Sequence, residues 1–182
     1  MRSLLQIASG DVLEIVSKYE KEKREEALNI IDSVECEGRE RLALQPGLFK
    51  LLRYLHREGI KKALLTRNSK NSVVHFIEAL YKKFDAKKRE EISDFLNFEI
   101  LLDRDHEHVK PNPLASLFIA KKLDLSPEQI LFVGDSLDDL STARSAGNLC
   151  AIMKNESNRY SLTKTDINFF IHIFILPQKK NE

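Results

Sequence analysis

The sequence predicts an α/β fold built on a doubly wound parallel sheet. Two observations predict it: short apolar runs that read as buried strands, and apolar residues at helical spacing between those runs. The four runs are KKALLT at 61–66, FEILL at 98–102, ILFVGD at 130–135 and LCAIM at 149–153. Because the runs are continuously apolar rather than alternating, we expect helices to cover both faces of the sheet.

Residues 11–45 read as helical, with no strand signal. Asp11 and Glu14 form a capping-box-like start, and apolar residues at helical spacing follow on both sides of the charged stretch KYEKEKREE. Pro46-Gly47 then breaks the chain. We therefore expect a small helical cap at 1–45 and an α/β core at 46–182.

Within the core, helical spacing separates the strands. An apolar stripe starts at Leu48 and ends before Gly59, which stands where a C-terminal cap belongs. Further helices are expected at 69–83, from Leu114 to about Leu125, and between the third and fourth strands, ending at Gly147. A short turn starting at Ser126 carries Pro and Gln at capping positions. The charged run at 82–91 reads as a solvated face or loop.

Bulk composition narrows the class of protein. The 182 residues suit one domain with a small insertion or cap, and 42% hydrophobic with 31% charged residues is a globular composition. Lys and Arg number 29 against 28 Asp and Glu, a net charge of +1. This balance gives no electrostatic reason to expect a nucleic-acid or membrane-surface partner.

No targeting segment is visible, so we expect a cytoplasmic protein. The N-terminus MRSLLQIASGD turns polar too quickly for a signal peptide. The apolar run INFFIHIFIL at 167–176 has ten residues, whereas a membrane span needs about 20. It reads as a strand or a buried tail. Two cysteines, Cys36 and Cys150, could form a disulfide but read better as reduced thiols.

Polar residues follow three of the strands, at the sheet edge where ligands bind in such folds. These segments start at Thr66, Asp103 and Gly134. GDSLDD at 134–139 places three acids after a buried strand, where each loses hydration. A divalent cation would account for them.

Four short motifs occur in a distinctive order: LLTRNS at 64–69, KPNP at 110–113, GDSLDD at 134–139 and SAG at 145–147. Together they resemble the haloacid dehalogenase-like hydrolases, from about residue 46 to 166. The resemblance implies a Rossmann-like core that transfers a phosphoryl group to an aspartate with the help of Mg²⁺. It implies a phosphomonoester phosphatase acting on a small phosphorylated metabolite.

The motif residues can be assigned roles. Thr66 can donate its hydroxyl hydrogen to a phosphoryl oxygen, and Lys110 can neutralise phosphate and orient a nearby carboxylate. Arg67 and Asn68, beside Thr66, complete the expected phosphate-binding set. Asp135 is the expected Mg²⁺ ligand, joined by Asp139 one helical turn on. Two further expectations are that Asp138 is a first-turn acid favoured by the helix dipole, and that Gly134 permits a close backbone approach.

Each assignment has a plainer alternative. Thr66 could be an ordinary turn residue, and Lys110 an ordinary surface lysine. The segment from Asp103 to His108 could be drawn as a metal cluster, but its two histidines are only two residues apart and no second ligand pair stands at zinc spacing. A solvated loop leading to Lys110 is the better interpretation.

One motif of the family is missing from these residues. Its members carry Asp-x-Asp, with the nucleophile first, at the end of a first strand in the middle of the sheet. The one Asp-x-Asp here, Asp103 and Asp105, follows another strand. The sequence thus resembles a family member whose first, central strand is absent, and we expect this chain to be inactive. The alternatives are a pseudo-phosphatase with a binding or regulatory role, and a doubly wound signalling module with an acidic pocket.

Overall fold

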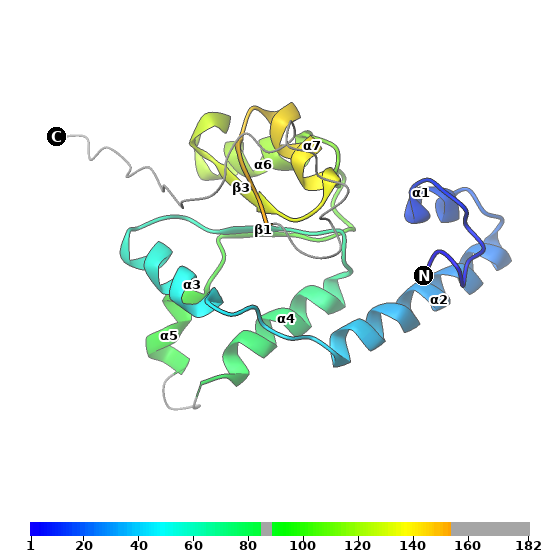
Figure 1. Cartoon of the computed structure of the whole chain (residues 1–182), viewed down its shortest axis with the longest axis horizontal. Helices are drawn as coiled ribbons and strands as arrows, with labels where there is room; N and C mark the ends of the chain where they lie inside the picture. Colours follow the sequence, from blue (N-terminus) through cyan, green and yellow to red (C-terminus); the bar gives the residue numbers. More distant parts are fainter. Residues whose placement is uncertain (85–88, 154–182) are drawn as a thin grey trace. The chain divides into compact units, whose positions relative to one another are not determined.

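The computed structural model describes residues 1–84 and 89–153 (Figure 1). The chain divides into two compact units. The first consists of Met1–Pro46 and Asn71–Phe84, and the second of Gly47–Lys70 together with the described residues from 89 onward. The apolar run at 167–176 lies outside the described residues, so its expected strand or tail stays a prediction.

The first unit is helical, as predicted for residues 11–45. It contains α1 (Val12–Ser17), α2 (Lys21–Glu40) and nearly all of α4 (Lys70–Lys82). Asp11 caps α1, because its carboxylate accepts a hydrogen bond from the backbone N–H of Glu14 at 2.9 Å. A small core forms where α1 packs on α2, from Ile7, Val16, Ala27 and Ile31. That this unit acts as a cap stays a prediction.

The second unit holds all four predicted strands. They are β1 (Ala63–Leu65), β2 (Ile100–Leu102), β3 (Leu131–Gly134) and β4 (Leu149–Ile152). Among the described residues they form two parallel pairs, β1 with β2 and β3 with β4, instead of one continuous sheet. The α/β class and the parallel pairing are confirmed, but no described strand joins β1 to β3.

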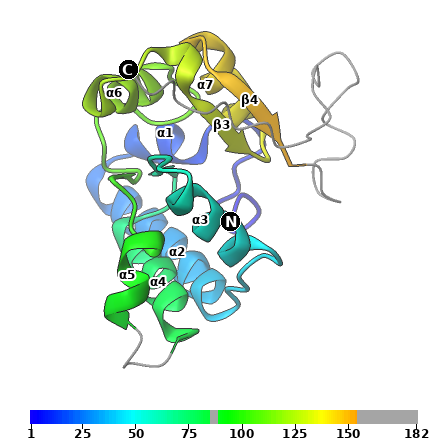
Figure 2. The ribbon, with the colours of Figure 1, turned by 90° about the vertical axis from the view of Figure 1, so that its left-hand side faces the viewer.

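The second unit also contains four α-helices among its described residues. They are α3 (Leu48–Arg57), α5 (Arg89–Leu96), α6 (Leu114–Leu123) and α7 (Leu137–Ala146), with a 3₁₀ turn, η2 (Pro127–Gln129). α7 packs against β3 and β4 (Figure 2). α6 packs against α7 and β1. The predicted stops are confirmed: Gly59 and Gly147 have φ of 66° and 78°, a left-handed conformation that favours glycine.

One expectation is narrowed and another needs correction. Of the solvated face or loop expected at 82–91, the loop cannot cover the whole run, because α4 extends to Lys82 and α5 begins at Arg89. α5 is stabilised by the apolar residues just beyond that run, Ile92, Phe95 and Leu96, which are buried as α5 packs against α3. The strands are also not covered throughout, since Leu131 and Val133 on β3 are 38% and 53% exposed.

The cysteines and the lengths of the helices were also subjects of prediction. Cys36 and Cys150 are both free thiols, as predicted. No helix in residues 1–84 or 89–153 combines the length and apolar character that crossing a membrane requires.

Candidate active site

The predicted site residues lie just beyond the carboxyl ends of the strands. Thr66 follows β1 directly and Asp135 follows β3 directly, while Lys110 comes from the segment between β2 and α6. Side-chain contacts bring these segments together, although the two strand pairs share no ladder.

Asp139 is at the centre of the site. Its Oδ1 accepts a hydrogen bond from Lys110 Nζ at 2.6 Å. Its Oδ2 accepts three more, from the backbone N–H of Asp135 at 3.0 Å, the backbone N–H of Ser136 at 2.9 Å and the Ser136 hydroxyl at 2.7 Å. Asp139 is only 3% exposed, so these donors replace the water that a buried carboxylate loses.

Local sequence explains why Asp139 turns back toward the strand. Ser136 is the N-cap of α7, and its hydroxyl also accepts a hydrogen bond from the backbone N–H of Asp139 at 3.1 Å. The two residues form a capping box three positions apart. Gly134 completes the turn, because a Cβ at that position would stand 2.3 Å from Asp139 Cγ. The expected close approach at Gly134 is therefore a contact with Asp139.

Two opposing effects set the charge state of Asp139. Burial raises the pKa of its carboxyl, but the hydrogen bonds from Lys110 and Ser136 and the charge of Lys110 lower it by more. The net pKa lies below the usual value of 3.8. Asp139 is therefore ionised at neutral pH, as the partner of a cation that is itself largely buried.

A second ion pair connects the end of β1 to α7. Arg67 NH1 donates to Asp138 Oδ2 at 2.5 Å, across 71 positions of the sequence. Asp138 is an acid of the first turn of α7, as expected, and the ion pair gives it a partner from a distant segment of the same chain. Arg67, expected among the phosphate-binding residues, already has a carboxylate to bind.

Thr66 and Asn68 form a tight turn after β1. Thr66 N–H donates to the Leu102 carbonyl at 2.9 Å, which fixes the turn against the end of β2. The Thr66 hydroxyl oxygen accepts a hydrogen bond from Asn68 N–H at 3.1 Å. Because this bond uses the oxygen, the hydroxyl hydrogen stays available to a ligand oxygen.

Asp135 is the acid best placed for a cation. Its residue is exposed, whereas Asp139 has both oxygens engaged by four donors. Mg²⁺ commonly takes one or two carboxylates and completes its shell with water and phosphate oxygens, so Asp135 fits as a single protein ligand. A direct Mg²⁺ bond to Asp139 would compete with Lys110. No group of three or more His, Cys, Asp or Glu residues in the described chain could hold a metal by itself.

The histidines of the loop after β2 have structural contacts. His106 Nδ1 lies 2.9 Å from the His108 carbonyl oxygen, and the His106 ring meets the Phe118 ring edge-on at 4.8 Å. The backbone N–H of Asp105 donates to the Asp103 carboxylate at 2.9 Å. These short-range contacts favour a turn over a metal cluster.

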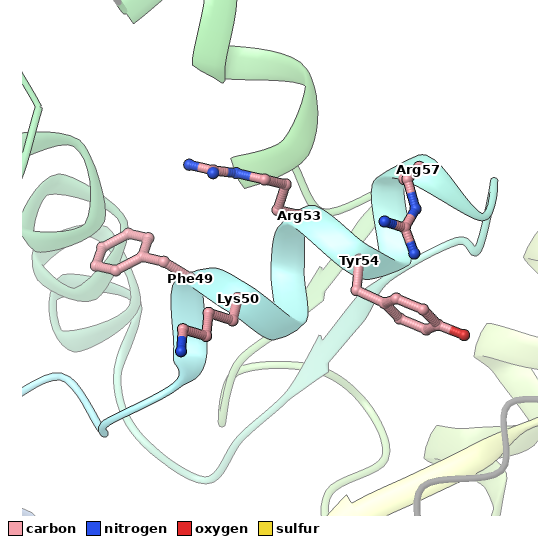
Figure 3. A pocket seen from close by; sticks show the side chains of 5 residues that line it. All are labelled: Phe49, Lys50, Arg53, Tyr54 and Arg57. Atoms are coloured by element: carbon pink, nitrogen blue, oxygen red, sulfur yellow. The ribbon is translucent and has the colours of Figure 1, made fainter.

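A shallow hollow of about 370 Å³ lies along α3, apart from the predicted site residues. Figure 3 shows that all its lining side chains project from this one helix: Phe49, Lys50, Arg53, Tyr54 and Arg57. Lys50, Arg53 and Arg57 were not predicted as site residues, although their helical spacing is visible in the sequence. Since the hollow includes neither Thr66, Lys110 nor any Asp of GDSLDD, it is not the site that the motifs predict.

A family model for haloacid dehalogenase-like hydrolases matches residues 2–147. The chain belongs to this family. The resemblance inferred from LLTRNS, KPNP and GDSLDD is thereby confirmed, and so is the fold class.

Individual proteins are also similar to this chain. An uncharacterized hydrolase of Saccharomyces cerevisiae is 34% identical over 87% of this chain and 68% of its own length. A phosphoglycolate phosphatase of Pseudomonas putida is 30% identical over 69% of this chain but only 42% of its own length. The chain thus spans about two thirds of the length of the first relative and less than half of the length of the second.

Solved structures show the same fold. A family IA, variant 3 hydrolase of the haloacid dehalogenase family from Entamoeba histolytica superposes with a TM-score of 0.63 at 22% identity. The match covers 94% of this chain and 75% of that protein.

The contact between Gly134 and Asp139 yields a first prediction. Gly134→Ala should lower the free energy of unfolding by about 2 kcal/mol, because the new methyl group displaces the Asp139 carboxylate. Chemical denaturation measures the change. Gly38→Ala is the matched control: nothing lies within 4 Å of its Cβ position in α2, so it should stabilise the helix slightly. Equal effects from both substitutions would contradict the steric argument.

The buried Lys110–Asp139 pair yields a second prediction. Asp139→Asn should cost about 3 kcal/mol of unfolding free energy, because Lys110 then keeps a buried charge without its partner. Glu14→Gln, which removes the exposed Lys18–Glu14 pair, is the control and should change little. Urea denaturation measures both.

The same pair predicts a pH dependence. The folded-state pKa of Asp139 lies below the unfolded value, so its stabilising contribution is present above about pH 4 and fades as pH falls. The stability difference between the native chain and Asp139→Asn should therefore shrink in acid. A difference that stayed constant down to pH 2 would show that ionised Asp139 is not the cause.

Proposed function

We propose that this site is of the phosphomonoester phosphatase type and takes a small phosphorylated metabolite. The observation that carries the proposal is a set of contacts beyond the strand ends. Lys110 and the Asp135 N–H both bind Asp139, and Arg67, next to Thr66, binds Asp138. The similarity to proteins named phosphoglycolate phosphatase supports a small phosphorylated substrate, because that name describes one.

Each residue would have a distinct role with a bound phosphate. The Thr66 hydroxyl donates to a phosphoryl oxygen, and the side-chain amide of Asn68 contributes a further donor. Lys110 supplies a positive charge whose position is fixed by Asp139, so little reorganisation is needed when phosphate arrives. Arg67 binds phosphate by exchanging its present partner, Asp138.

Mg²⁺ is the cofactor we infer for this site. Bound by Asp135 and by phosphate oxygens, it would neutralise charge on the phosphoryl group. Asp139 would then act mainly by holding Lys110 and the turn that presents Asp135.

We expect the printed chain to bind phosphate but to hydrolyse phosphate esters poorly or not at all. Phosphoryl transfer in this family needs an attacking aspartate, and Asp103 and Asp105 form a local turn after β2 instead. The alternative is a binding or regulatory protein that holds phosphate without turnover. Two results together would favour that alternative. The printed chain would bind inorganic phosphate and lose this binding in Thr66→Val, and no extended form of the chain would be active.

The proposal predicts that catalysis depends on an added strand. The printed chain should not hydrolyse p-nitrophenyl phosphate above background, because Thr66, Lys110 and Asp135 can position a phosphoryl group but none replaces the attacking carboxylate. An N-terminal fusion that supplies an apolar strand followed by Asp-x-Asp should gain Mg²⁺-dependent activity. The release of p-nitrophenol measures it.

Two substitutions in the fusion protein sharpen this test. Lys110→Ala should lower the rate by about 100-fold or more, since a charge on the transferred group loses its partner. Lys50→Ala removes an exposed lysine of α3 and should have little effect. Hydrolysis by the printed chain that disappears in Lys110→Ala would overturn the assignment and make Asp103 or Asp105 the candidate nucleophile.

A further prediction concerns the metal. The printed chain should bind Mg²⁺ weakly, and Asp135→Asn should weaken binding by about tenfold, because Asp135 is the single exposed ligand proposed. Isothermal titration calorimetry measures both affinities. Asp124→Asn is a matched control, because Asp124 is the left-handed C-cap of α6, a conformation that Asn also adopts. Equal affinities in the chain and Asp135→Asn would remove Asp135 from the site.

A further inference from the structure

The hollow on α3 lies between two rows of side chains on that helix. Phe49, Arg53 and Arg57 are four residues apart and form one row, and Lys50 and Tyr54 form the next (Figure 3). Rows of residues four apart are the ridges that pack into grooves when two helices meet. Since every lining side chain comes from α3, the hollow has one wall, and a second helix can supply the other.

This face of α3 is basic. Lys50, Arg53 and Arg57 are exposed, and the helix sequence LFKLLRYLHR contains no acid. The Nε of Arg57 lies 2.9 Å from the carboxylate of Glu58, but both side chains are largely exposed, and such a pair contributes little. Aromatic rings line the same hollow. It therefore suits an occupant that carries acidic residues around an apolar side chain.

Shape and charge narrow the class of occupant further. A small molecule needs a concave site that encloses most of its surface, whereas this hollow is shallow and lined by a single helix. Nucleic-acid binding relies on many phosphate contacts, but the hollow has three Lys and Arg side chains and the chain has a net charge of only +1. A helix of a protein fits the groove best.

The chain carries a matching surface on α2. Leu28 is 43% exposed, with Glu25 three residues before it and Asp32 four residues after it. These spacings put the three side chains on one side of the helix. Asp32 lies 3.8 Å from Arg39, but its side chain is 62% exposed and can pair with another cation. Over its whole length α2 has seven acidic residues against four Lys and Arg.

The charges on the two helices have the same spacing. Glu25 and Asp32 are seven residues apart. Lys50 and Arg57 are also seven residues apart. Seven residues make about two turns, roughly 10.5 Å along a helix. Two carboxylates can therefore face two cations while Leu28 enters the hollow between them.

We propose that α2 of one copy of this chain docks on α3 of a second copy. The exposed leucine of α2 enters the hollow beside its aromatic rings, and the two acids that flank it pair with the cations at the two ends. Because each copy carries both helices, one dimer can make the contact twice. The inference goes beyond the proposed function, because association requires no turnover.

Sedimentation velocity of the full chain tests the association. A reductant is present, so that the exposed Cys36 cannot link two copies. The average sedimentation coefficient should rise between about 10 and 300 µM protein, and the rise should be smaller at high salt, which screens the charges. A monomer at every concentration would refute the proposal.

Two charge-reversed variants test the pairing. Glu25→Lys with Asp32→Lys makes the α2 surface basic, and Lys50→Glu with Arg57→Glu makes the α3 surface acidic. Each variant alone should raise the dissociation constant at least about tenfold, because like charges then meet. When the two variants are mixed, every α2 surface finds an α3 surface of opposite charge, so association should return. A mixture that associates no better than either variant would overturn the proposal.

A matched control separates this pairing from net charge. Glu26→Lys with Glu37→Lys changes the charge of α2 by the same amount, but on another side of the helix, since each residue advances by about 100°. It should leave the dissociation constant nearly unchanged. A loss equal to that of Glu25→Lys with Asp32→Lys would show that only the net charge matters, and would refute the proposal.

The leucine has its own matched pair of variants. Leu28→Ser should weaken association at least about fivefold, because the hollow loses its apolar occupant. Leu42→Ser alters a leucine that is 40% exposed against 43% for Leu28, but lies just beyond the end of α2. It should have little effect. Equal losses from both substitutions would place the contact elsewhere and refute the proposal.

Concentration dependence separates a contact between copies from one within a single chain. Charge reversal that lowers the melting temperature equally at all concentrations, without any dimer of the native chain, would refute the proposal. A dimer that none of these substitutions weakens would also refute it. Inactivity of the strand-fused chain would count against the proposed function alone, because sedimentation measures association without substrate.

Discussion

The Asp139 carboxylate is the contact on which the rest of the site depends. It binds Lys110 from the segment after β2 and, at the same time, the backbone turn that follows β3. Without it, Lys110 would carry a buried charge alone, and the first turn of α7 would lose its capping box. Position 134 requires glycine, because the Asp139 carboxylate occupies the space that a Cβ on residue 134 would need.

This contact also changes how the acidic motif is understood. Three acids after one strand suggest a cation site, yet each has a different task. Asp139 is a buried structural anchor, Asp138 binds Arg67, and Asp135 is the exposed acid. The arrangement separates the residue that holds the turn from the residue that can meet a ligand. A metal bound by Asp135 need not disturb the charges that hold the strand ends together.

The sequence was informative where signals are local. Apolar runs located all four strands, and Gly59 and Gly147 located helix ends, because each signal lies within a few residues. α5 was missed because the lysines and acids at 82–91 outweighed the short apolar face that begins at Ile92. The partner of Arg67 lies 71 positions away, so no spacing rule could reveal it. Likewise, periodicity finds strands but does not say which edges stay open.

The two ion pairs at the strand ends differ in their access to solvent. The side chains of Lys110 and Asp139 are 14% and 4% exposed, whereas those of Arg67 and Asp138 are 29% and 39% exposed. Dissolved ions weaken an ion pair between exposed side chains by screening, and they screen a buried pair much less. Rising salt concentration therefore loosens the bond between β1 and α7 first. One of the two ion pairs at the strand ends thus responds to the ionic surroundings, and the other responds far less.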